Sequence, residues 1–131
     1  MVPAIVDTNV VVAGLLTSDV HAPTARLLDQ MLAAAFPFAV SLALLAEYHD
    51  VLNRSKLRRR HGLNATEVEA LVTEIAHHAI VLQAVATVAA PDPGDQHLWN
   101  LLAARNDLVL VTGDKRLLQS DWAERICTPQ F

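Results

Sequence analysis

Short apolar runs alternate with longer amphipathic segments along almost the whole chain, and this alternation restricts the fold more than any other feature. The apolar runs lie at 4–6, 38–41, 80–85 and 108–111, with a last short one near Ile126. Such runs are typical of strands in a parallel sheet that is covered by helices on both faces. We therefore expect an α/β protein, a three-layer α/β/α sandwich with a central parallel sheet of four to five strands.

The segments between the strands carry helix start and stop signals. Pro23 suits a first helical turn and Pro37 ends the segment 23–36, while Asn64 is a suitable N-cap for a helix over 65–78. Gly62 separates this helix from the one before it. The same kind of pattern predicts further helices over 10–16 with Asn9 as N-cap, over 42–54, over 95–105 and from Lys115 onward.

Length and composition restrict the class of protein. A chain of 131 residues with 53% apolar residues can form one compact domain, so we expect a single domain over 1–131. No apolar run approaches the roughly 18 to 20 residues of a membrane span, and the first residues do not resemble a secretory signal, so we expect a cytoplasmic protein that does not bind membranes. Cys127 is the only cysteine; it cannot form an internal disulfide, and we assign it no function.

Two acidic residues follow expected strands. Asp7 comes directly after the run 4–6, and Asp114 follows the run 108–111 after Thr112 and Gly113. The carboxyl ends of parallel strands lie at one edge of a sheet, where ligands usually bind, so we expect both carboxylates there. A carboxylate directly after a buried strand must be paired, neutral or bound to a metal, which makes Asp7 the hardest of the acids to explain by structure alone.

Glu47 and Asp95 are further candidates, each with a structural alternative. Glu47 lies beside Val51 at the margin of an apolar helical stripe and so can point into a cleft, although it could also be an ordinary solvated residue. Asp95, like Asp114, begins an expected helix and could be an N-cap worth roughly 0.5 to 2 kcal/mol. His97, two residues after Asp95, is the one histidine that we place near these acids.

Four gathered carboxylates repel one another unless a cation neutralises them. Mg²⁺ and Mn²⁺ accept oxygen ligands, and one or two such ions could activate a water for phosphodiester cleavage. The net charge of −4 agrees with this interpretation, because without the four acids the remaining ten acidic residues balance the ten basic ones. The composition thus favours an acidic metal site on an otherwise neutral protein.

Four short motifs resemble, in order and spacing, those of PIN-domain nucleases, and the chain is most similar to the toxin component of toxin–antitoxin pairs. The motifs are Asp7-Thr8-Asn9, Glu47-Tyr48, Asp92-Pro93-Gly94-Asp95 and Thr112-Gly113-Asp114. The resemblance implies metal-dependent cleavage of RNA, an antitoxin protein as partner and a homodimer. It also implies that Asp7, Glu47, Asp95 and Asp114 bind the metal, that Thr8 and Asn9 support Asp7, and that Thr112 lines the site. Related sequences often have two adjacent acids where this chain has Gly94-Asp95, so it stays open whether Asp92 is a ligand and whether one or two ions bind.

A cluster of cationic side chains is a candidate for binding RNA phosphates, because such side chains supply most sequence-independent affinity for nucleic acids. It consists of Arg54, Lys56, Arg58, Arg59 and Arg60. The alternative is a solvated helix end, whose dipole the same charges would complement.

Two other functions share part of the pattern. A phosphatase of the haloacid dehalogenase type also has an aspartate after the first strand and a later Gly-Asp pair near Mg²⁺, but here Asn9 stands where its general acid would be a second aspartate. A catalytically silent module that binds RNA or protein would not need the four acids. Cation binding that depends on these acids separates the silent module from an enzyme.

Overall fold

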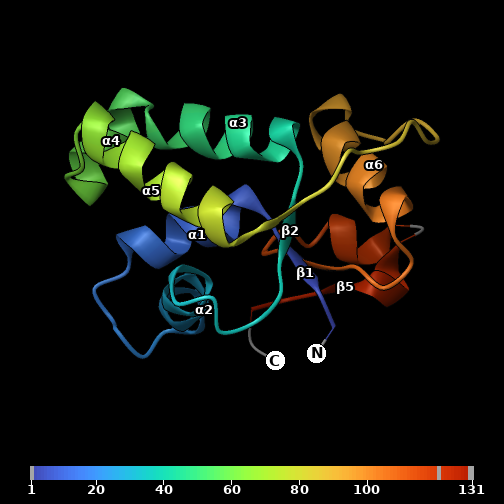
Figure 1. Cartoon of the computed structure of the whole chain (residues 1–131), viewed down its shortest axis with the longest axis horizontal. Helices are drawn as coiled ribbons and strands as arrows, with labels where there is room; N and C mark the ends of the chain where they lie inside the picture. Colours follow the sequence, from blue (N-terminus) through green and yellow to red (C-terminus); the bar gives the residue numbers. More distant parts are fainter. Residues whose placement is uncertain (1, 121, 130–131) are drawn as a thin grey trace.

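The computed structural model describes residues 2–120 and 122–129 and shows short strands in the interior with helices around them (Figure 1). The strands are β1 (Ala4–Val6), β2 (Ala39–Val40), β3 (Ile80–Val81), β4 (Val109–Val111) and β5 (Ile126–Cys127). The helices are α1 (Thr8–Leu16), α2 (Pro23–Leu32), α3 (Leu42–Leu52), α4 (Ser55–His61), α5 (Ala65–His78) and α6 (Gln96–Ala104). Single 3₁₀ turns are η1 (Pro93–Asp95), η2 (Leu117–Gln119) and η3 (Ala123–Arg125).

All strand pairs in the described residues are parallel, which confirms the predicted α/β class. β4 lies between β1 and β5 in a three-stranded sheet. β2 and β3 form a second pair, which approaches β1 through a single bridge between Ala4 and Phe38. The hydrogen-bonded sheet therefore has fewer strands than the four to five expected, because only this one bridge connects the two sets.

The core lies where the strands meet the apolar faces of the helices. α1 packs against α2 and α3, α3 packs against α5, and α6 contacts α3. Ile5 and Leu110, at the centres of β1 and β4, are fully buried. Tyr48 of α3 is also fully buried, and its hydroxyl donates a hydrogen bond to the carbonyl oxygen of Val6. This contact connects α3 to the end of β1, next to Asp7.

Two predicted helix boundaries were wrong for local reasons. α1 begins at Thr8 with Asp7, not Asn9, as its N-cap, because the Asp7 carboxylate accepts a hydrogen bond from the Thr8 amide. α2 ends at Leu32 rather than at residue 36, since Ala34 adopts a positive φ of 53° that a right-handed helix cannot continue. By contrast, α5 matches the predicted range 65–78 and begins with a capping box between Asn64 and Glu67.

Three further predictions need correction. The helix predicted over 42–54 ends at Leu52, and the basic segment after Arg54 forms a separate helix, α4, which Gly62 ends in a left-handed conformation. The strand predicted over 80–85 is only two residues long, because its partner β2 ends where Ser41 caps α3. No regular helix follows Lys115 in the described residues 115–120 and 122–129, where only η2 and η3 form. Within the described chain, no helix is both long and apolar enough to cross a membrane.

Candidate active site

Asp7 is held at the end of β1 by contacts on both its backbone and its side chain. Its amide donates to the carbonyl of Val111 on β4, and only 8% of its surface is exposed. The carboxylate accepts hydrogen bonds from the Thr8 amide at 2.8 Å and from the Thr112 hydroxyl at 2.7 Å. Asp7 therefore lies at the carboxyl edge of the sheet, as predicted.

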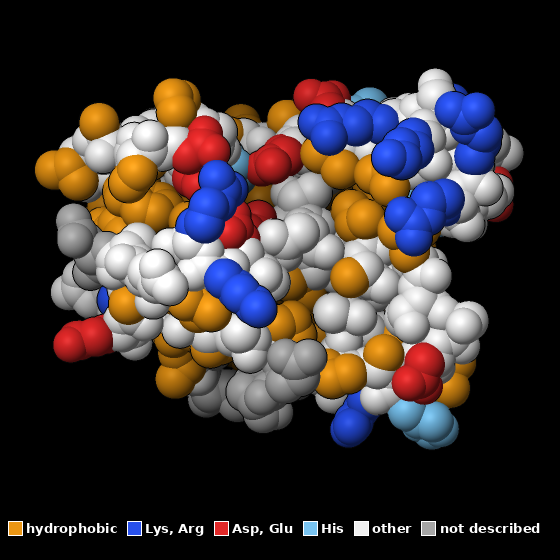
Figure 2. All heavy atoms as spheres, turned by 180° about the vertical axis from the view of Figure 1, so that it is seen from behind, with side chains coloured by type: hydrophobic (Ala, Val, Ile, Leu, Met, Phe, Trp, Pro, Cys, Tyr) orange, Lys and Arg blue, Asp and Glu red, His pale blue; other side chains and the backbone are white. Residues whose placement is uncertain are grey.

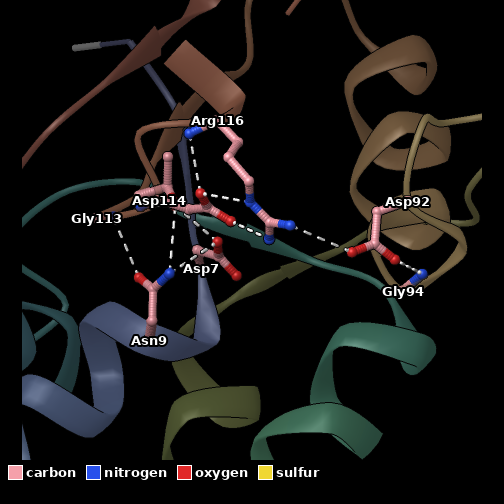
Figure 3. A network of polar contacts seen from close by, with 8 residues as sticks. Asp7, Asn9, Asp92, Gly94, Gly113, Asp114 and Arg116 are labelled. Atoms are coloured by element: carbon pink, nitrogen blue, oxygen red, sulfur yellow. Dashed lines mark hydrogen bonds and ion pairs between the residues drawn. The ribbon is translucent and has the colours of Figure 1, made fainter. Parts of the chain in front are cut away.

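Thr112 connects Asp7 to Asp114. Its hydroxyl donates to Asp7 Oδ2 and accepts the amide N–H of Asp114 at 3.1 Å. Asn9 adds a second connection, because its side-chain oxygen accepts the Gly113 amide at 3.1 Å while its Nδ2 lies 3.4 Å from both Asp7 Oδ2 and Thr112 Oγ1. Figure 3 shows Asp7 and Asp114 side by side above Asn9. The structure thus brings Asp7 and Asp114 together, as the sequence predicts.

Burial disfavours ionisation of the Asp7 carboxyl group. Removal from water is the largest influence and raises its pKa above the usual range, and the hydrogen bonds from Thr112 and Thr8 only partly offset it. The negative charges of Glu47 and Asp95 raise the pKa further. Both of these acids therefore lie close enough to Asp7 to act on its charge, although α3 and the η1 turn supply them.

Glu47 points from α3 toward α6, where it meets His97. The ring Nε2 of His97 lies 2.5 Å from Glu47 Oε2, with the two side chains 17% and 35% exposed. This ring is the main reason why the pKa of Glu47 is held below its usual range. The Thr8 side chain also lies beside Glu47 and helps to lower this pKa, so two neighbours stabilise the charged form of the Glu47 carboxylate.

The sequence left open that Asp95 is only a helix N-cap, but its side chain does not act as one. It precedes α6, but its side chain makes no capping hydrogen bond. Partial burial is the first cause that raises the pKa of Asp95, and the neighbouring charges of Asp92 and Asp114 add to it. The cap of this segment is Asp92, whose Oδ1 accepts the Gly94 amide at 2.9 Å. Within the described residues Asp95 therefore lacks a capping role, and its charge is influenced by the acids Asp92 and Asp114 and by the side chains of Arg116 and His97.

Arg116 is a prominent member of the site that the sequence did not single out. Its guanidinium forms two hydrogen bonds to the Asp114 carboxylate, at 3.2 Å and 2.8 Å, and extends to within 3.7 Å of Asp92 (Figure 3). This contact holds the pKa of Asp114 below its usual range. The only signal in the sequence is that Arg116 stands two residues after Asp114, a spacing that allows both its amide and its side chain to reach the carboxylate.

The residues fit a hard divalent cation in their chemistry. The donors at this edge are carboxylate and hydroxyl oxygens: Thr112 connects the carboxylate of Asp7 to Asp114, and the charges of Glu47 and Asp95 act on Asp7. Within residues 2–120 and 122–129, no three acidic, histidine or cysteine side chains lie close enough to form a complete metal site. Mg²⁺ commonly binds through one or two carboxylates and keeps several waters, so the arrangement suits such an ion without a closed protein cage.

The predicted RNA-binding residues lie on and next to α4. Arg54 precedes the helix, and the helix carries Lys56, Arg58, Arg59 and Arg60, all at least partly exposed. Arg58 and Arg59 line a surface pocket of about 400 Å³ together with Ser55 and Asn64. Figure 2 shows Lys and Arg side chains gathered at the end of the molecule where Figure 1 places α4, on a face that carries acidic side chains nearer its middle. The Arg54 charge also lowers the pKa of Glu47, which places the two groups within electrostatic reach.

Comparison with known proteins agrees with this geometry over most of the chain. The family model of the PIN domain matches residues 3–116, a range that contains all four predicted acids and Arg116. A search of curated proteins finds no match to the chain.

Proposed function

This chain belongs to the family of PIN domains, which are generally nucleases, and from this premise we propose that it is a metal-dependent endoribonuclease that hydrolyses phosphodiester bonds. The observation that carries the proposal is the buried Asp7 carboxylate, which Thr112 connects directly to Asp114. The role of Asp7 as the N-cap of α1 explains its contact with the Thr8 amide but not its further connection to Asp114, and burying an unneutralised carboxylate costs free energy. The same arrangement suits a site that holds a cation.

In the proposed reaction Asp7 and Asp114 hold Mg²⁺ or Mn²⁺, with Glu47 and Asp95 completing the acidic shell and Asp92 as a further candidate. One or two bound ions would supply charge neutralisation and an activated water at neutral pH. Thr112 and Asn9 fix the direction of the Asp7 carboxylate through their hydrogen bonds, and the Thr8 amide fixes its other oxygen. His97 holds Glu47 in its ionised form, because its ring lies against Glu47 Oε2.

We propose that the cations on and beside α4 bind the RNA backbone. Figure 2 shows Lys and Arg side chains on a face that also carries acidic side chains, and the charge of Arg54 acts on Glu47, so these cations would attract a polyanion toward the site. Each phosphate contact that is lost should lower the salt dependence of binding by about one unit of slope. Replacing Arg59 and Arg60 with glutamine should therefore weaken RNA binding and reduce its slope against salt by about two, as measured by fluorescence anisotropy. An unchanged slope would show that α4 is only a solvated helix.

The biological setting that we propose is a cytoplasmic toxin paired with a cognate antitoxin protein and present as a homodimer. The support for this setting is the resemblance of the motifs Asp7-Thr8-Asn9 and Thr112-Gly113-Asp114 to those of toxin components. A neighbouring reading frame that encodes a short protein able to suppress the activity would support it. Light scattering of the purified chain would test the dimer independently.

A cleavage assay tests the proposed activity. The purified chain should cut a labelled RNA internally in the presence of Mg²⁺ or Mn²⁺, a chelator should stop the reaction, and added metal should restore it. A phosphatase of the haloacid dehalogenase type would instead release phosphate from phosphomonoesters and leave internal bonds intact. The absence of internal cleavage at any metal concentration would count against the ribonuclease.

A further inference from the structure

Arg116 occupies the outward face of the acidic site. Three of its N–H groups, from the backbone amide, Nε and one terminal nitrogen, converge on the two oxygens of Asp114 at 3.0 Å, 3.2 Å and 2.8 Å. The other terminal nitrogen lies 3.7 Å from Asp92 Oδ2. The guanidinium therefore bridges the two segments that carry Asp114 and Asp92, as Figure 3 shows.

This position conflicts with metal binding by Asp114. A carboxylate has few lone-pair sites, and both oxygens of Asp114 already accept charge-assisted hydrogen bonds from Arg116. A divalent cation on the same oxygens would also meet the positive charge of the guanidinium. The side chain of Arg116 is 73% exposed, and exposed ion pairs contribute little free energy, so the guanidinium can leave Asp114 at small cost.

A pocket beside the acids would allow RNA to approach the guanidinium of Arg116 once this group has left Asp114. The pocket has a volume of about 540 Å³; Asp92, Asp95 and Arg116 line one part of it, and Trp99 and Leu117 supply apolar surface. Asp92 and Asp95 would repel a phosphate, Gln119 and Ser120 could donate hydrogen bonds to it, and Arg116 is the cation among the lining residues. An RNA strand that passes the acids would therefore meet Arg116 in the lining of this pocket as a cation for a backbone phosphate, and guanidinium groups bind phosphate in bidentate geometry.

We propose that Arg116 is the resident cation of this site: it neutralises Asp114 in the metal-free protein, and it exchanges Asp114 for an RNA phosphate when a divalent cation binds. This inference rests on the proposed ribonuclease function. It predicts opposite effects of one substitution on two ligands, because Arg116 competes with the metal but cooperates with the RNA. A purely structural role in positioning Asp114 would weaken the binding of both.

Calorimetric titration of Mn²⁺ in the absence of RNA tests the first half. Arg116→Gln should bind Mn²⁺ about fivefold more tightly than the unchanged chain, the upper range for loss of an exposed competing ion pair. The matched control is Arg105→Gln, which removes the same charge from a similar two-residue pair with Asp107 that the site does not include, and it should change the affinity less than twofold. Equal or weaker Mn²⁺ binding by Arg116→Gln would overturn the proposal.

Single-turnover cleavage at saturating Mn²⁺ tests the second half. For Arg116→Gln the RNA concentration that gives half the maximal rate should rise about fivefold, and its salt dependence should fall by about one unit of slope. An unchanged half-saturating concentration would overturn the transfer to phosphate. If the unchanged chain binds no Mn²⁺, the proposed function fails instead, so the two failures are distinguishable.

Discussion

Replacing Asp7 with asparagine should lower metal-dependent RNA cleavage at least about a hundredfold and leave the fold intact. Loss of residues that merely orient metal ligands commonly costs 10-fold to 100-fold, and a direct ligand should cost at least as much. The fold should persist because burial already raises the pKa of Asp7, so a neutral side chain suits this position, and asparagine can still accept the Thr8 amide as an N-cap. Cleavage rates and circular dichroism measure the two effects separately.

The matched control for this substitution is Asp29→Asn on α2. Asp29 is exposed and takes no part in the site, so its loss removes one negative charge without removing a proposed ligand. Its cleavage rate should stay within about twofold of that of the unchanged chain, since surface substitutions away from special features have small effects. Full activity in a folded Asp7→Asn protein would contradict the assignment of Asp7 as a metal ligand.

A second large effect is expected from Leu110→Ala, which should destabilise the protein by about 2 to 5 kcal/mol. Leu110 is the central residue of β4, it is fully buried, and β4 pairs with β1 on one side and β5 on the other. Truncation of the Leu110 side chain would leave a cavity beside β4, the strand that leads to Thr112 and Asp114. Urea denaturation followed by circular dichroism measures the free energy of unfolding.

The exposed leucine of α3 provides the comparison. Leu42 is 75% exposed, so Leu42→Ala should change the free energy of unfolding by less than about 0.5 kcal/mol. A loss in Leu110→Ala as small as that in Leu42→Ala would contradict the burial of Leu110 in the core. A large loss confined to Leu110→Ala would support it.

The positions of Asp7 and Asp114 could be predicted because they depend on short-range rules. Each follows an apolar run, and the carboxyl ends of parallel strands lie at one edge of the sheet. The helix over 65–78 was predictable for a similar reason, since Asn64 and Glu67 provide a capping box within four residues. The PIN-domain match over residues 3–116 supports the same arrangement from a different kind of observation.

Contacts between residues far apart in the chain could not be predicted in this way. The sequence indicated Asn9 as a helix cap, but its side chain instead contacts Gly113, more than 100 residues away. Nothing in the sequence indicated a role for Arg125 either, yet its guanidinium donates to the carbonyls of Leu102, Arg105 and Leu108 and thereby joins the end of α6 to the residue that precedes β4. Such contacts depend on the distances between packed elements, which hydrophobic periodicity does not specify.

The most direct test of the acidic site is a calorimetric titration with Mn²⁺ of two proteins, the unchanged chain and the double variant Asp7→Asn/Asp114→Asn. The two carboxylates share Thr112 and are proposed as the central ligands, so their joint loss should remove the binding. We predict saturable Mn²⁺ binding by the unchanged chain and none by the double variant at the same concentrations. Equal Mn²⁺ affinity in the two folded proteins would contradict a metal site formed by these acids.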